Sequence, residues 1–277
     1  MVKSAHHLRF STALRRLALL SWTPLACSLL ACTSTPTPTP RASDTSIAEL
    51  PERSSERAVA LLETGDLATA EEILVELQGT EPDNPSVALL LGRVFFEGER
   101  FSEAIDQFQN LVRLDDEVAL HHLWLGRALG EHVQRVPSLQ RLPLARRLHD
   151  TFRRAVELDP ESAEAHLALA RFYSEAPAFA GGNRALAQTH AERLIQLDPP
   201  RGHLRMGLIL ENWGRADEAR EHVLAALDAG PETVETWRDA GLFFERQGSP
   251  EKARSLLEKA VELDPDDEIA RQHLAGL

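Results

Sequence analysis

Small and apolar residues in the second half of the chain recur at a fixed spacing of 34 residues. The spacing separates the members of five pairs: Gly207 and Gly241, Gly214 and Gly248, Ala219 and Ala253, Ala226 and Ala260, Pro231 and Pro265. A period of 34 residues is typical of solenoids built from helix-turn-helix units. The pattern therefore predicts pairs of α-helices stacked side by side, because one pair alone cannot bury its apolar face.

The same positional pattern extends over residues 51–277, with small residues at two positions of each unit and large apolar residues between them. The eighth position holds Ala58, Gly92, Gly126, Ala170, Gly207 and Gly241. The twentieth position holds Ala70, Ala104, Leu148, Ala187, Ala219 and Ala253. Only Leu148 departs from the rule. Helices that cross closely leave little room for side chains at the contact, so these positions predict where each pair meets.

This pattern resembles the tetratricopeptide repeat. The resemblance implies an all-α fold, a right-handed α-solenoid of about six helix-turn-helix repeats followed by a short capping helix. The predicted repeats are 51–84, 85–118, 119–162, 163–199, 200–233 and 234–267, and the cap is 268–277. Most of the second helices end at a proline, which lacks an amide donor and disfavours helical backbone before it.

Two predicted repeats are longer than the others. The third has about ten extra residues around 136–144, and the fourth has about five in 176–183, relative to the 34-residue unit. We predict that both insertions are loops between the two helices of a repeat. Loops accept insertions at little cost, so these segments either have no role or form a rim beside a binding groove.

The first 31 residues have the charge layout of a secretory signal. Basic residues precede an apolar run at 17–31, and no acidic residue occurs before Asp44. The run contains Pro24 and is shorter than the ~20 residues that span a bilayer. We therefore predict that 1–31 is a cleaved signal peptide.

Residues 29–32, with the sequence Leu-Leu-Ala-Cys, resemble the lipobox of bacterial lipoproteins. The resemblance implies that the chain is cut before Cys32 and that Cys32 is lipidated. Alternatively, Cys32 is an ordinary small residue of a leader. Residues 32–50 are then a linker whose Thr-Pro repeats favour extended backbone. By resemblance to enterobacterial lipoproteins, Thr33 after the cysteine points to the outer membrane, so we expect a lipid-anchored cell-envelope protein that faces the periplasm.

Charge and cysteine content exclude further classes. Without the four basic residues of 1–31, 26 Lys and Arg residues remain against 43 Asp and Glu residues. Nucleic acid is not an expected partner, because proteins bind it through basic surfaces. With Cys27 removed and Cys32 lipidated, no thiol remains for a disulfide or a thiolate metal site.

An arginine recurs in the ninth position, which lines the concave groove in arrays of the tetratricopeptide family. Five arginines in four successive repeats are candidate groove residues for a protein or peptide ligand: Arg93, Arg127, Arg171, Arg201 and Arg205. The last two match basic positions of the carboxylate-clamp subfamily. Leu123 and Ala168 stand where a clamp needs Lys and Asn, so we do not predict a clamp.

An alternative interpretation gives these arginines no ligand. Glu97, Glu131 and Glu175 follow the first three arginines by four residues, a distance at which helical side chains meet. Each arginine would then pair with its own glutamate on a solvated face. Such exposed pairs contribute only ~0.3–0.5 kcal/mol, so a ligand carboxylate could compete for the guanidinium.

The histidines and acidic residues do not predict a reactive site. His122, His166 and His203 share one position in three repeats, but equivalent positions on packed helices lie ~8–10 Å apart, too far for one ion. We interpret them as packing residues and predict neither a metal nor a cofactor. The chain has no nucleophile elbow and no HExxH motif, and we predict that it is not an enzyme.

Two functions fit these observations. The first is a membrane-anchored scaffold that binds a protein or peptide in the concave groove. The alternative is a structural, self-associating subunit of an envelope assembly machine, of the pilus or outer-membrane biogenesis type. Its exposed apolar face would comprise Trp213, Phe243, Phe244 and the end helix to Leu277. The oligomeric state stays open, with a monomer favoured.

Overall fold

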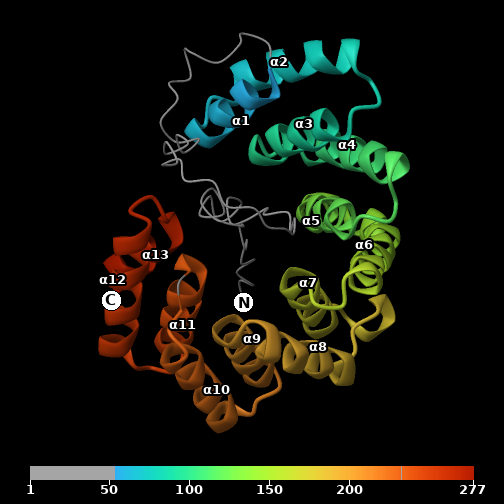
Figure 1. Ribbon diagram of the computed structural model, residues 1–277. Helices are drawn as coiled ribbons and strands as arrows, with labels where there is room; N and C mark the ends of the chain where they lie inside the picture. Colours follow the sequence, from blue (N-terminus) through green and yellow to red (C-terminus); the bar gives the residue numbers. More distant parts are fainter. Residues whose placement is uncertain (1–53, 232) are drawn as a thin grey trace, which may run out of the picture.

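The computed structural model describes residues 54–231 and 233–277 (Figure 1). The predicted signal peptide, Cys32 and the linker to residue 50 lie outside these residues. The described chain consists of helices and connections, without a strand. In chain order the helices are α1 (Ser55–Thr64), α2 (Leu67–Thr80), α3 (Pro85–Glu97), α4 (Phe101–Leu114), α5 (Ala119–Arg135), α6 (Ser138–Leu158), α7 (Ala163–Glu175), the 3-10 turn η4 (Ala178–Ala180), α8 (Arg184–Leu197), α9 (Pro199–Asn212), α10 (Ala216–Asp228), α11 (Val234–Arg246), α12 (Pro250–Leu263) and α13 (Glu268–Gly276).

The helices form a curved array of antiparallel pairs. Figure 1 shows α3, α5, α7, α9 and α11 on the inside of the curve and their partners α4, α6, α8, α10 and α12 on the outside. Each helix packs most extensively against its neighbours along the chain. The all-α solenoid predicted from the sequence is therefore confirmed, and we call the surface of the odd-numbered helices toward the inside of the curve the inner face.

Local signals in the sequence determine where the helices begin. Asn84 caps α3, since its side chain accepts hydrogen bonds from the backbone N–H groups of Ser86 and Val87, and Pro85 follows at the first helical position. Ser162 caps α7 in the same way, by accepting from Ala165 N. These side chains bind N–H groups that have no partner within the helix.

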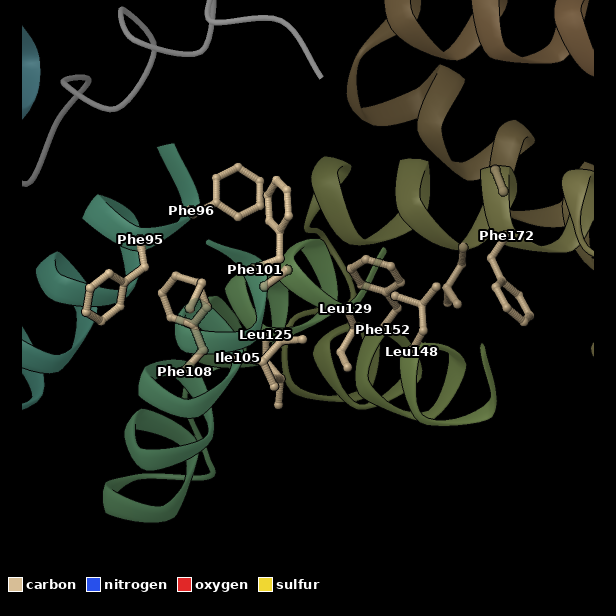
Figure 2. Packing of buried hydrophobic residues seen from close by; sticks show 14 of the residues in the cluster. Phe95, Phe96, Phe101, Ile105, Phe108, Leu125, Leu129, Leu148, Phe152 and Phe172 are labelled. Carbon is tan, nitrogen blue, oxygen red and sulfur yellow. The ribbon is translucent and has the colours of Figure 1, made fainter. Parts of the chain in front are cut away.

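The small residues at the eighth position mark the contacts within each helix pair. A Cβ atom added to Gly126 in α5 would overlap the ring of Phe152 in α6, and one added to Gly241 would lie 2.8 Å from Leu257 Cγ. Leu148 departs from the small-residue rule because Gly130 opposite it has no side chain. A Cβ atom there would lie 3.9 Å from Leu148 Cδ1. Figure 2 shows Leu129, Leu148 and Phe152 packed together inside this pair.

The insertion in the third repeat is not a loop, so this prediction is wrong. Residues 138–144 are helical and belong to α6, and only Val136 and Pro137 separate α5 from α6. The extra residues lengthen both helices, to 17 residues in α5 and 21 in α6. Pro143 lies inside α6 without ending it. In the fourth repeat the inserted residues do connect the two helices, through η4.

The proposed apolar face for self-association is contradicted at two of its residues. Phe243 and Phe244 are both completely buried, and their rings contact each other edge to face at 5.3 Å. Adjacent residues of a helix point in different directions, and both can be buried here because α11 packs against α9, α10 and α12. Trp213 is partly buried against the core. None of the helices in the described part of the chain has the length and hydropathy of a membrane span.

A buried ion pair fixes the last helix to the array. Arg238 in α11 donates from Nη1 to Asp267 Oδ2 at 3.0 Å, and the two residues are 5% and 2% exposed. Asp267 also caps α13 by accepting from Ala270 N. The carboxylate of Asp267 thus both caps α13 and connects this helix to α11.

Candidate ligand-binding groove

The five predicted groove arginines lie on neighbouring odd-numbered helices. Arg93 is in α3, Arg127 in α5, Arg171 in α7, and Arg201 and Arg205 are both in α9. The charged and aromatic side chains that contact these arginines belong to odd-numbered helices or to the residue that caps α9. This places the arginines on the inner face.

Arg93 and Arg127 lie beside Trp124 in the part of the inner face formed by α3 and α5. The Cζ atom of Arg127 lies 4.3 Å from the centroid of the Trp124 ring and 5.4 Å from that of Phe96. Arg93 Cζ approaches the same tryptophan at 5.7 Å. Guanidinium groups at these distances are attracted to the electron-rich ring faces.

Neither of these two arginines forms an ion pair with any residue that the structure describes. Burial lowers the pKa of Arg93, and it lowers the pKa of Arg127 as well. Glu97 attracts both cations, whereas the charge of Arg93 works against that of Arg127. The Nε atom of Arg93 is buried without a hydrogen-bond partner. Two partly buried cations therefore lie beside the same tryptophan ring without a carboxylate in direct contact.

The second group of arginines differs, because acidic side chains already contact it. Glu175 lies 3.2 Å from Arg171 Nε and 3.6 Å from Arg205 Nη1. Arg201 binds Glu164 at 2.9 Å and Asp198 at 3.1 Å. Burial lowers the pKa of Arg205, with the charge of Arg171 acting in the same direction.

The alternative interpretation predicted three arginine–glutamate pairs within helices, and only one of these pairs forms among the described residues. Arg171 and Glu175 form the predicted pair. Glu131 instead binds Arg135 at 3.0 Å, one turn further along α5, and is 5% exposed. Burial raises the pKa of the Glu131 carboxyl group. Glu97 acts on Arg93 and Arg127 only through its charge.

Trp124 is the functional candidate that the sequence analysis missed. It is partly exposed, stacks on Phe108 with ring centroids 5.6 Å apart, contacts Phe96 edge to face at 5.8 Å, and lies beside the two arginines. Its position in α5 corresponds to that of Arg205 in α9, two residues before the glycine of the helix crossing. A tryptophan at a groove position was the signal that could have identified it.

Comparison with known proteins now identifies the family. The sequence matches the model of the tetratricopeptide repeat family at residues 55–119, 89–131 and 204–268, which together cover more than half of the chain. The chain belongs to the tetratricopeptide repeat family. Proteins of this family act as scaffolds that bind protein or peptide partners, and the fold is typically non-enzymatic.

Individual tetratricopeptide relatives are distant. Superkiller complex protein 3 of Mus musculus is 26% identical over 220 residues, which are 76% of this chain but only 13% of that protein. A tetratricopeptide repeat protein from Parabacteroides merdae has a similar structure, with a TM-score of 0.63 at 15% identity, over 80% of this chain and 81% of its own. The structure of Pseudomonas aeruginosa PilF matches with a TM-score of 0.53 at 16% identity, over 80% of this chain and 96% of its own. At these identities the structural likeness shows the fold alone.

The histidines of this tetratricopeptide array connect successive repeats. His122 Nε2 lies 2.9 Å from the carbonyl oxygen of Asp116, and His166 Nε2 lies 3.1 Å from that of Pro160. Trp237, in the equivalent position, donates its indole N–H to the carbonyl oxygen of Pro231 at 3.1 Å. In each case a ring N–H reaches a carbonyl six residues earlier, at the end of the preceding repeat. The described residues contain no group of three or more side chains arranged to hold a metal ion.

Two histidine pairs join the helices of the fourth and fifth repeats. His166 Nδ1 in α7 lies 2.9 Å from His190 Nδ1 in α8, and His203 Nδ1 in α9 lies 3.0 Å from His222 Nδ1 in α10. Because His166 donates from Nε2 to a carbonyl, its Nδ1 is the acceptor and His190 is the donor. Burial and, to a smaller extent, the charge of His166 together lower the pKa of His190 to about 4.

Proposed function

We propose that this protein is a membrane-anchored scaffold of the bacterial cell envelope that binds an acidic segment of a protein on its inner face. The observation that carries this proposal is the pair of partly buried arginines, Arg93 and Arg127, which lack a carboxylate partner among the described residues. Family membership supports a protein or peptide as the ligand.

A ligand carboxylate would give Arg93 and Arg127 the direct contact that the nearby carboxylates, which act on them only through their charge, do not make. A guanidinium that is removed from water loses hydration free energy. The attraction to Trp124, ~0.5–2 kcal/mol, compensates for only part of this loss. A carboxylate that receives charge-assisted hydrogen bonds from Arg93 and Arg127 would contribute ~1.5–3 kcal/mol per bond. Because the planar guanidinium donates two parallel N–H groups, both arginines are suited to bidentate binding of a carboxylate.

The α7–α9 region supports the same proposal in a different way. Arg171, Arg201 and Arg205 already contact Glu175, Glu164 and Asp198. We therefore place the main acidic contact of the ligand at Arg93 and Arg127. The ion-paired arginines of α7 and α9 then orient the rest of the segment through hydrogen bonds.

Photo-crosslinking and charge reversal test the groove directly. Leu120 is exposed in α5, one helical turn before Trp124, so a photoreactive amino acid at this position reports a ligand on the inner face. We expect Leu120 to crosslink to a partner in intact cells. The substitution R127E should lower the affinity of the purified protein for that partner at least ~30-fold, because it replaces an attraction of a few kcal/mol by repulsion.

A matched control separates the groove from general charge effects. Arg254 is exposed on the outer helix α12, and R254E changes the net charge by the same amount. We expect its crosslinking yield and affinity to equal those of the unchanged protein. Equal partner affinity for R127E and R254E would refute binding at Arg93 and Arg127.

The self-associating alternative has no specific observation in its favour. Its apolar face included Phe243 and Phe244, which are buried. We therefore retain a single proposed function and a monomeric state in the proposal.

A further inference from the structure

A second surface of the protein departs from its acidic composition. Residues 132–149 and 176–191 contain no aspartate or glutamate, in a chain that has 43 of them. The same residues include five arginines: Arg135, Arg141, Arg146, Arg147 and Arg184. We call these two segments the basic edge.

The two segments of the basic edge lie together in the array. Each one contains the connection from the first to the second helix of its repeat, so both are at the same edge of the solenoid, and η4 packs against α6 (Figure 1). The tip between α5 and α6 also projects. Because α6 has 21 residues and α4 has 14, α6 is longer than α4 by ~10 Å, at 1.5 Å per residue.

The basic edge carries the two most exposed large apolar side chains of the described residues. Leu139, at the start of α6, is 94% exposed, and Phe179, in η4, is 79% exposed. Moving a leucine or phenylalanine side chain from water into an apolar environment is favourable. Neither side chain is buried in the core of the array. An apolar environment for them would therefore have to be supplied by a binding partner.

Cations are positioned next to these apolar tips. Arg141 donates from Nε to the carbonyl oxygen of Val136 at 3.0 Å, which holds its guanidinium beside the start of α6. Arg146 is exposed and forms no ion pair with a described residue. Further along α6, Arg153 is 3.4 Å from Glu157, so the outer surface of this helix becomes charge-balanced within two turns.

We propose that the basic edge rests on a bilayer surface that contains anionic phospholipid. Leu139 and Phe179 are inserted between headgroups, and lipid phosphates bind the arginines of the edge other than Arg135, which is paired with Glu131 and Glu99. Protruding apolar side chains flanked by cations are suited to the water–lipid interface, where the charged heads stay hydrated. Arginines near an anionic bilayer are attracted to its surface. We favour a bilayer over an acidic protein because the apolar tips are separate and protruding, whereas protein interfaces bury such anchors in complementary pockets.

This inference rests on the proposed function only for the presence of a membrane nearby. An anchor at Cys32 brings the array to a bilayer, and contact through the basic edge would orient the array on it. The inner face, which is a different surface, would remain open to its partner.

A single fluorescent label tests the contact. A mature chain lipidated at Cys32 has no other thiol, so L139C creates one labelling site in the full-length protein. We would attach a polarity-sensitive dye and reconstitute the protein into vesicles of phosphatidylcholine mixed with phosphatidylglycerol. The expected result is a shift of the emission to shorter wavelength, absent in pure phosphatidylcholine and reversed by high salt, because salt screens exposed charges.

Two controls make the result specific. S255C places the same dye on the exposed surface of the outer helix α12 and should show no shift. Adding R146E to L139C should lower the salt concentration that reverses the shift, whereas R153E should lower it less, since Arg153 is already paired.

Three outcomes would overturn the proposal. They are an unshifted emission at residue 139 in anionic vesicles, an equal shift in pure phosphatidylcholine, and crosslinking of residue 139 to a protein in cells without a shift in vesicles. Absence of lipidation at Cys32 would be recognised separately. The unsubstituted protein would then react with the dye at Cys27 or Cys32. In that case the same measurement is made in chains with C27A and C32A.

Discussion

At the scale of single residues, the absence of a side chain determines how the helix pairs pack. Gly92 and Gly126 each lie against a phenylalanine ring of the partner helix, at positions where a Cβ atom would overlap the ring. Glycine in a helix interior is usually unfavourable by ~1 kcal/mol relative to alanine. Its presence at these positions is therefore a consequence of close helix crossing.

Alanine substitutions at two helical glycines should have opposite effects. G126A should lower the free energy of unfolding by ~1–3 kcal/mol, because the new methyl group forces Phe152 out of its position. G79A in α2, where the added Cβ atom would have no neighbour within 4 Å, should raise it by ~0.5–1 kcal/mol. Thermal or urea unfolding followed by circular dichroism measures both. A stabilising effect of G126A as large as that of G79A would contradict close packing at the crossing.

Residues of the same type and position nevertheless differ in their surroundings. Arg127 and Arg171 occupy equivalent positions in α5 and α7, each with a glutamate four residues later. Arg171 forms an ion pair with its glutamate. Glu131 instead forms an ion pair with Arg135, and the guanidinium of Arg127 lies over the ring of Trp124. The difference arises because the longer α5 supplies a competing arginine, Arg135, one turn further on.

At the scale of elements, the histidine pairs connect the two helices of the fourth and fifth repeats. Burial lowers the pKa values of His166, His190, His203 and His222, which face one another as two pairs. In the unfolded chain a histidine titrates near pH ~6.5. The folded state therefore binds fewer protons than the unfolded state as the pH falls below that value, so acid favours unfolding.

We expect the stability that depends on these histidines to be complete above pH ~7 and to fall as the pH decreases from ~6.5 toward 4. The loss attributable to His190 should reach ~1–3 kcal/mol, because its pKa in the folded protein is about 4. Unfolding of H190Q, measured from neutral to acidic pH, should depend less on pH than unfolding of the unchanged protein.

H132Q provides the comparison for the histidine pairs. His132 lies in α5 and is not hydrogen-bonded to another histidine in the described structure. An H132Q profile that is as flat as that of H190Q would show that the pairs do not cause the acid sensitivity.

At the scale of the whole molecule, the proposal joins three parts with separate tasks. In this proposal, a lipidated Cys32 would hold the chain to a membrane, the Thr/Pro-rich linker of 32–50 would separate the array from the headgroups, and the helical array would bind the partner. Several acyl chains on one residue bind a bilayer stably, whereas a single chain binds only marginally. In this proposal, stable membrane association of the mature protein should therefore depend on Cys32.

Substitution of the two cysteines tests this division. C32A should move the protein from the membrane fraction to the soluble or unprocessed fraction, while C27A, a matched change in the leader, should leave it membrane-bound. Fractionation of cells, with metabolic labelling by a clickable palmitate analogue, measures both. Continued membrane binding and labelling of C32A would exclude Cys32 as the anchor.

The sequence was sufficient for the solenoid because helix pairing is encoded by short-range regularities. The 34-residue period, the glycines at the crossings and the capping residues each act within one or two helices, so their meaning does not depend on distant parts of the chain. The positions of the five arginines on odd-numbered helices followed from the same regularity.

Only the tertiary structure decided how individual charges and apolar side chains are partnered. The sequence could not show that Arg127 would lie on Trp124, that Phe244 would be buried, or that residues 138–144 would continue a helix. Such outcomes depend on which of several nearby groups a flexible side chain reaches once neighbouring helices pack. Regular spacing determines the arrangement of the backbone, whereas competition among side chains from adjacent helices determines the chemistry of the surface.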